Sequence, residues 1–288
     1  MSITNDLKYK FSTLNIAEKL IVVNVVVFIL NTLLVFLLQL APNVLMQWFQ
    51  LPKGFLDFLM QPWSIVTYAF FHGSIMHLFW NMLLLYFSSR IFLNLFSKKY
   101  FLNVYFLGAI LGGVFFLLSY NIFPVFSRVN SPLIGASAAI MAILIFVCTY
   151  LPNQEVRLIF FNIKLWYLGV AFVLLDLVQL PLGNAGGHIA HLGGALLGFV
   201  YAKKLQEGKD IGEGFSSVLS SISSIFKPNK KSPLKTVHKK SNQTATKKVS
   251  KNEHQKQIDA ILDKISKSGY ESLSKEEKDF LFKAGKDA

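Results

Sequence analysis

Six long apolar stretches dominate the chain, and polar connections separate them. They cover residues 20–40, 74–96, 101–123, 133–151, 162–182 and 188–205. A bilayer core about 30 Å thick requires about 20 helical residues. The apolar residues do not alternate with polar ones, and a spanning segment must satisfy its own backbone hydrogen bonds, so each stretch is expected to be a helix. The pattern therefore predicts an all-α membrane protein with a bundle of six transmembrane helices.

The composition supports a membrane protein, and its positive charge is concentrated in the C-terminal part of the chain. Hydrophobic residues make up 53% of the chain, and the net charge is +13. Of the 29 Lys and Arg residues, 19 lie from Lys203 onward. Such a basic tail is typical of a cytoplasmic segment that fixes topology and contacts anionic lipid of the bilayer. No nucleic-acid-binding motif accompanies the tail, and no nucleic acid partner is expected.

The connections between the stretches carry positive charge alternately. Lys and Arg residues occur before the first stretch, in the second and fourth connections and in the tail. The first and third connections hold only Lys53 and Arg128, and the fifth holds none. Under the positive-inside rule both termini are cytoplasmic, which agrees with an even number of spans.

The first connection, residues 41–73, is too long for a simple turn and too often interrupted by proline to span. Its many aromatic residues and few charges suit a structure that lies in the outer membrane interface. The alternative is an apolar lid packed on the bundle. In both cases we do not expect a loose loop.

Four segments are expected along the chain. Residues 1–19 form a cytoplasmic N-terminal segment, 20–205 the six-span body, 206–252 a disordered basic linker and 253–288 a small two-helix unit. One helix face in the last segment carries Ile258, Ile261, Leu262 and Ile265, and a capping-box spacing follows at Ser274 and Glu277. A unit of this size is too small to be stable alone, so it is expected to dock on an unknown partner.

Small residues recur in three of the stretches. They are Gly108 and Gly112 in the third, the run from Gly135 to Ala139 in the fourth, and Gly194 and Gly198 in the sixth. Small side chains let helix backbones approach closely, and such packing drives helix association in lipid. The fourth and sixth spans are therefore predicted neighbours, with Gly135, Ala138, Gly194 and Gly198 as supports for their packing.

Polar side chains suited to catalysis lie near the same end of three stretches. The second, fourth and sixth spans are expected to run in one direction, and His77, Ser137 and His191 each lie near the start of one. Asn81, four residues after His77, projects from the same helix face. A serine hydroxyl needs a base to take its proton, and the resulting oxyanion needs hydrogen-bond donors. His191 is the candidate base; His77, Asn81 and the Ser137 N–H are the candidate donors.

Each of these residues also has a structural interpretation. The serine among small residues is compatible with helix packing alone, and the histidines are compatible with interhelical hydrogen bonds. His188 and His191 with His72 and His77 are an alternative metal site, but no carboxylate or thiolate accompanies them convincingly. No metal and no cofactor is therefore expected. Asp176 is the one acid placed where it can orient a histidine, but a structural hydrogen bond is the favoured interpretation of this residue.

Three motifs resemble those of the rhomboid intramembrane serine proteases. They are Gly135-Ala136-Ser137-Ala138 in the fourth span, Ala190-His191-Leu192-Gly193-Gly194 with Gly198 in the sixth, and His77 with Asn81 in the second. The resemblance covers about residues 15–205. It implies a Ser137–His191 dyad without a required acid, with His77 and Asn81 as oxyanion donors. It further implies cleavage of membrane-anchored proteins in or near their transmembrane segments, in a bacterial inner membrane, with the fifth span as the moving side for substrate entry.

The chain departs from the family pattern at three places. Ala138 follows the serine where glycine is frequent, Met141 stands where some members have an aromatic residue, and Ser64 follows Trp63 where arginine is frequent. None of these changes removes a reacting group, but they leave rate and substrate preference open. Two other functions stay open: a pseudoprotease that binds membrane clients without cleavage, and a transporter with a polar lining. The protease is favoured because both Ser137 and His191 are present.

Overall fold

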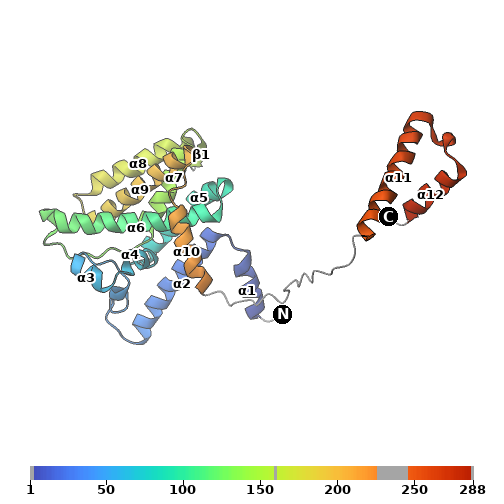
Figure 1. The fold of residues 1–288 in the computed structure, drawn as a ribbon. Coiled ribbons are helices and arrows are strands. Elements are labelled where there is room, and N and C mark those ends of the chain that lie inside the picture. The colour runs from blue at the N-terminus through green and yellow to red at the C-terminus, as the bar shows by residue number, and fades with distance from the viewer. Residues whose placement is uncertain (1–2, 159–160, 226–245, 287–288) are drawn as a thin grey trace. The chain divides into compact units, whose positions relative to one another are not determined.

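The structure, a computed structural model, describes residues 3–158, 161–225 and 246–286. It divides into two compact units, Met1–Pro228 and Asn229–Ala288. The first unit holds the apolar body of the chain, in which helices α6, α7, α8 and α9 lie side by side (Figure 1). The described chain is mostly helical, which confirms the predicted all-α class.

The helices of the first unit follow the order of the apolar stretches. The longer ones are α1 (Ile3–Thr13), α2 (Ile16–Leu37), α5 (Ile75–Leu95), α6 (Lys98–Ile122), α7 (Ser137–Tyr150), α8 (Leu165–Gln179), α9 (Ala185–Gln206) and α10 (Glu213–Ile225). Short helical turns are η1 (Met46–Trp48), α3 (Phe55–Met60), α4 (Ser64–Thr67), η2 (Tyr68–Phe70) and η3 (Pro124–Phe126). Helices α2 and α5 to α9 occupy the six predicted stretches.

Three helices of the described chain, α2, α5 and α6, are long and apolar enough to cross a membrane. Helices α7 and α8 are also apolar but have only 14 and 15 residues. The chain thus contains several candidate membrane spans, as expected, while the count of six stays a prediction.

Two helices begin later than the hydrophobic pattern predicts. Helix α8 starts at Leu165 because a hairpin precedes it, in which β1 (Glu155–Leu158) pairs antiparallel with β2 (Phe161–Lys164). Helix α7 starts at Ser137 because Leu133 exchanges backbone hydrogen bonds of 2.9 and 3.0 Å with Leu51. In both places the backbone groups are satisfied by an extended partner, so the helix cannot extend further toward the N-terminus.

Helix α7 is the centre of the first unit, with every residue from Ala138 to Cys148 buried. Helices α6 and α9 approach it through glycines. A Cβ on Gly108 would overlap the side chain of Ala142, and a Cβ on Gly194 would overlap the carbonyl oxygen of Ala138. The absence of these Cβ atoms lets the three backbones pack in direct contact, so the N-terminal end of α7 is held firmly between its neighbours.

The first connection is a packed structure rather than a loose loop. The Tyr68 hydroxyl donates to the carbonyl oxygen of Ala109 on α6 at 2.7 Å, and Trp63 Nε1 donates to the carbonyl oxygen of Trp48 at 2.7 Å. Leu51 and Tyr68 are buried on its inner side, while Trp48 and Leu56 are 59% and 77% exposed. One face therefore packs on the bundle, and the opposite face is apolar and suited to a membrane interface.

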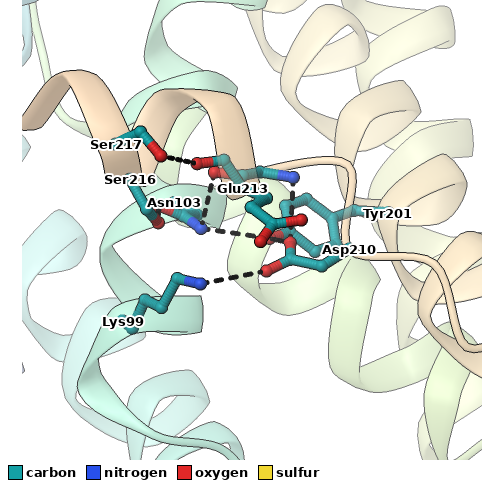
Figure 2. Close-up of polar contacts among 8 residues, drawn as sticks. Lys99, Asn103, Tyr201, Asp210, Glu213, Ser216 and Ser217 are labelled. Atoms are coloured by element: carbon teal, nitrogen blue, oxygen red, sulfur yellow. Dashed lines mark hydrogen bonds and ion pairs between the residues drawn. The ribbon is translucent and has the colours of Figure 1, made fainter.

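Helix α10 lies within the stretch that was expected to be a disordered linker. Asn103 of α6 donates from Nδ2 to the carbonyl oxygen of Gly212 at 3.1 Å and accepts from Ser216 Oγ at 2.8 Å (Figure 2). The Tyr201 hydroxyl of α9 donates to Asp210 Oδ1 at 2.5 Å, and Lys99 lies 3.5 Å from the second oxygen of that carboxylate (Figure 2). These contacts tie the segment to α6 and α9. Residues 226–245 of the expected linker lie outside the described residues.

The second unit contains α11 (Thr246–Ser268), the turn η4 (Tyr270–Ser272) and α12 (Lys275–Lys286). It begins before the predicted residue 253. A capping box is present at its second helix, since Ser274 N–H donates to Glu277 Oε2 at 2.7 Å and Glu277 N–H donates to Ser274 Oγ at 3.2 Å. Hydrogen bonds from Lys264 and from the Ser274 backbone lower the pKa of the Glu277 carboxyl. The second unit therefore consists of two helices joined by a short turn, and its docking on a partner stays a prediction.

Candidate functional site

The N-terminal ends of α5, α7 and α9 meet at one cavity. His77 lies in the first turn of α5, Ser137 begins α7, and His191 lies in the second turn of α9. All three line a cavity of about 1270 Å³ together with Asn81. The later turns of α2, the first connection and residues 131–134 before α7 also contribute to its wall. The four residues singled out from the sequence are thus brought to one place.

The backbone before Ser137 lies directly on the polar side chains of α5. Gly135 has a φ of +112°, and a Cβ there would lie 2.7 Å from His77 Nε2 and 3.6 Å from Asn81 Nδ2. Only glycine tolerates both this conformation and this approach. The Gly135 N–H donates to the carbonyl oxygen of Tyr68 at 2.9 Å, so the first connection fixes the turn.

Hydrogen-bond donors without acceptors face this turn. Asn81 is buried, and its Nδ2 has no hydrogen-bond partner among the described residues. Ser137 is the first residue of α7, where backbone N–H groups lack intrahelical acceptors. Buried donors are normally satisfied, so unused ones at a cavity mark a place for a ligand oxygen.

Ser137 and His191 are held close by the contact between α7 and α9. Gly194 packs on the carbonyl oxygen of Ala138, and Gly198 packs on that of Ala142. The first of these contacts lies immediately after the serine and about one turn after the histidine, and the second lies one turn further along both helices. No direct hydrogen bond joins Ser137 Oγ to His191 in the part of the chain that the structure describes. Such bonds in enzymes often tighten only when substrate binds.

Asp176 on α8 joins both histidines of α9. Its Oδ1 lies 2.7 Å from His188 Nδ1 and 2.8 Å from His191 Nδ1. Asp176 is 5% exposed, and its Oδ2 has no partner within the described residues. The sequence predicted one acid near a histidine but not its contact with two. The spacing of His188 and His191, three residues apart, is the sequence feature that indicates a shared partner, since it places both histidines on one helix face.

The same three residues are the group that could hold a metal ion within the described chain. Their ligand atoms all lie within 4.8 Å of one another. The set differs from the alternative metal site considered from the sequence, because it includes a carboxylate and excludes His72 and His77. Both Nδ1 atoms are already hydrogen-bonded to Oδ1 of the carboxylate, so neither nitrogen is free to bind a metal ion in this arrangement.

His72, in the loop before α5, also lines the cavity, and its ring centroid lies 5.0 Å from that of His77. Burial, with a smaller contribution from His77, lowers the pKa of His72 to about 3. The folded protein therefore keeps this imidazole neutral, whereas the unfolded chain binds a proton below about pH 6.5.

A dependence of stability on pH follows from this difference. Because the unfolded state binds the extra proton, stability should fall as the pH drops from about 6.5 toward 3, by up to about 1.4 kcal/mol per pH unit. We expect the thermal unfolding temperature of His72→Phe in detergent to fall less between pH 7 and pH 5 than that of the wild type. The wild type and the variant share all other histidines, so a difference between their pH slopes is attributable to His72. Equal slopes would contradict a neutral buried His72.

The fold and this cavity define a helical membrane protein with a serine and two histidine-bearing helices at one end. Residues 59–207 match the Rhomboid domain, a region that contains all four cavity residues discussed above. The chain belongs to the rhomboid family, as its motifs indicated. Residues 247–283 match a family of unknown function, DUF6576, which corresponds to the second unit.

Several curated relatives match about half of the chain. Presenilin-associated rhomboid-like protein A, mitochondrial, of Danio rerio is 33% identical over 141 residues, which cover 48% of this chain and 36% of the relative. The corresponding Rattus norvegicus protein is 32% identical over 147 residues, 50% of this chain and 37% of the relative. RHOMBOID-like protein 12, mitochondrial, of Arabidopsis thaliana is 28% identical over 158 residues, 51% of this chain and 47% of the relative. The chain thus spans less than half the length of these relatives.

These relatives correct the predicted location. The resemblance led to the expectation of a bacterial inner membrane, whereas the matching proteins are mitochondrial by name. The prediction was wrong in this respect because hydropathy and charge asymmetry describe how a chain lies relative to a membrane and do not identify the membrane. The membrane character itself is supported by the long apolar helices.

Proposed function

We propose that the chain is an intramembrane serine protease that cleaves membrane-anchored proteins in or near their transmembrane segments. The observation that carries the proposal is the convergence of Ser137 with a histidine base and unused hydrogen-bond donors at one cavity. Membership of the rhomboid family supports the same chemistry. The substrates would be transmembrane proteins that reach the cavity from the surrounding bilayer.

The reaction would proceed by acyl transfer. Ser137 Oγ attacks the carbonyl carbon of the substrate peptide bond while its proton passes to His191. The tetrahedral intermediate then collapses, His191 gives the proton to the leaving amine, and an ester remains on Ser137. A water molecule, activated in the same way, hydrolyses the ester and restores the serine.

The negative oxygen of the intermediate needs donors that are already in place. Asn81 Nδ2 is a buried donor without a partner, and the Ser137 N–H belongs to the open end of α7. His77 presents its Nε2 edge to the same turn. Loss of one such donor typically lowers the rate about 10²- to 10³-fold. Loss of His77 or Asn81 should therefore lower the rate of cleavage, whereas loss of Ser137 or His191 should abolish it.

Hydrolysis also needs water, which lipid does not supply. The wall that α2 and the first connection contribute to the cavity includes the polar side chains of Asn31, Gln39 and Gln50. A cavity of about 1270 Å³ with such polar groups in its wall has room for many water molecules. The cavity therefore meets the second requirement of a protease that works among membrane helices.

The test is proteolysis by the full-length chain in liposomes that also contain single-span reporter proteins. The wild type should cleave at least one reporter at a bond in or next to its transmembrane segment, as located by mass spectrometry. A chelator such as EDTA should leave the rate unchanged, because no step uses a metal. Reporter binding without cleavage across the panel would identify a pseudoprotease, and solute flux without cleavage would identify a transporter.

A further inference from the structure

The cluster of Asp176, His188 and His191 adds a third residue to the two-residue mechanism. We infer that Asp176 is a positioning residue that sets the tautomer and orientation of His191, an inference that rests on the proposed protease function. Ser137, His191 and Asp176 would then act together, with Asp176 holding the histidine in place. The rhomboid resemblance implied no such acid.

The tautomer follows from hydrogen-bond chemistry. An ionised carboxylate only accepts hydrogen bonds, so each Nδ1 within bonding distance of Asp176 Oδ1 must carry its proton. These distances are 2.7 Å for His188 and 2.8 Å for His191. A neutral His191 with a proton on Nδ1 has its lone pair on Nε2. That lone pair is what a base facing Ser137 requires.

The two histidines differ in what else they contact. His191 lines the cavity that holds Ser137, whereas His188 is not among the residues of that wall. Their side chains are 20% and 12% exposed, respectively. His188 therefore does not face Ser137. Its hydrogen bond to Asp176 Oδ1 helps to fix the oxygen that also binds His191.

The setting of Asp176 argues against a contact that only joins helices. Burying a carboxylate is costly unless its oxygens are fully hydrogen-bonded, and Oδ2 has no partner in the described chain. Within that part of the chain, Asp176 is also the one side chain of α8 that hydrogen-bonds to another helix. An ionisable side chain in an apolar helix raises the free energy of the folded protein, so Asp176 is expected to have a function.

The proton transfer from Ser137 to His191 explains how Asp176 would assist catalysis. When Ser137 Oγ bonds to the substrate carbon, its proton moves to His191 Nε2 and the imidazole becomes positively charged. The carboxylate of Asp176 stabilises this cation through the Nδ1–H bond and takes no proton itself. The proton leaves with the departing amine, and His191 returns to the same tautomer.

The experiment compares the full-length wild type with Asp176→Ala, Asp176→Asn and Asp176→Glu in reporter liposomes. We expect Asp176→Ala and Asp176→Asn to lower kcat about 10²- to 10⁴-fold with little change in KM, because the base is misoriented while the substrate still binds. Asp176→Glu should restore part of kcat. Asp279→Asn, the same chemical change at an exposed site in the second unit, is the matched control and should match the wild type.

A second readout reports the tautomer directly. Nitrogen-15 NMR of labelled histidines, assigned with a His191→Gln variant, should show neutral His191 with its proton on Nδ1 in the wild type. In Asp176→Asn the neutral ring should instead exchange between the Nδ1–H and Nε2–H tautomers. Wild-type kcat in both Asp176→Ala and Asp176→Asn, or an unchanged His191 tautomer, would overturn the inference. If the wild type itself cleaves nothing, the proposed function fails, and the tautomer measurement still decides the role of Asp176.

Discussion

Replacing either Ser137 or His191 with alanine should abolish cleavage of membrane-anchored reporters while the protein stays folded. Ser137 supplies the attacking oxygen, and without it no ester can form. His191 is the base that lines the same cavity, and without it the hydroxyl remains a weak nucleophile. We expect each variant to lose on the order of 10³- to 10⁶-fold in kcat.

The losses of kcat caused by Ser137→Ala and His191→Ala should not be additive. Because the serine and the histidine act in one proton transfer, the double variant should be about as inactive as each single one. Ser127→Ala is the matched control, since this exposed serine lies outside the cavity, and it should cleave at the wild-type rate. Retained cleavage by Ser137→Ala or His191→Ala, measured on the same reporter, would refute the serine mechanism.

Replacing Gly194 with alanine should destabilise the protein and the site together. A Cβ at this position would overlap the carbonyl oxygen of Ala138, so α9 must move away from α7. Such overpacking typically costs about 1–3 kcal/mol, and here the obstacle is backbone, which cannot rotate away. Separation of the helices would also increase the distance between Ser137 and His191. We expect a Tm lower by several degrees and a kcat reduced well beyond the loss of folded protein.

Gly214→Ala is the matched control for this substitution. Gly214 lies in α10, and a Cβ there would meet no atom within 4 Å. The alanine should leave Tm unchanged or raise it slightly, because alanine is the better helix former. A Gly194→Ala protein as stable and as active as Gly214→Ala would mean that α7 and α9 are not in close contact.

The sequence predicted the helices and the catalytic candidates for clear physical reasons. Apolar runs of bilayer length have few alternatives to helix, and small residues at intervals of four mark close helix contacts. Polar groups such as His77 and His191 in these runs are costly, which made them conspicuous. The structure places them at one cavity, while their catalytic roles stay proposals.

Other features depended on information that no local pattern contains. The contact of Asp176 with His191 depends on how α8 is rotated against its neighbours, and close packing of Gly169 on Cys148 fixes the approach of α8 to α7. The start of α7 depends on a backbone pairing with Leu51, which is distant in sequence. Helix α10 was missed because its many serines resemble a linker, although Asp210 ties its start to α9.

The most direct test of the serine mechanism is covalent labelling of the full-length protein in liposomes with a fluorophosphonate probe, followed by mass spectrometry of the labelled peptide. A serine that reacts with this electrophile must have a base beside it and donors for the developing oxyanion. We predict an adduct on Ser137 in the wild type and at most a trace in His191→Ala. An unlabelled Ser137, or equal labelling of Ser137 without His191, would contradict the account.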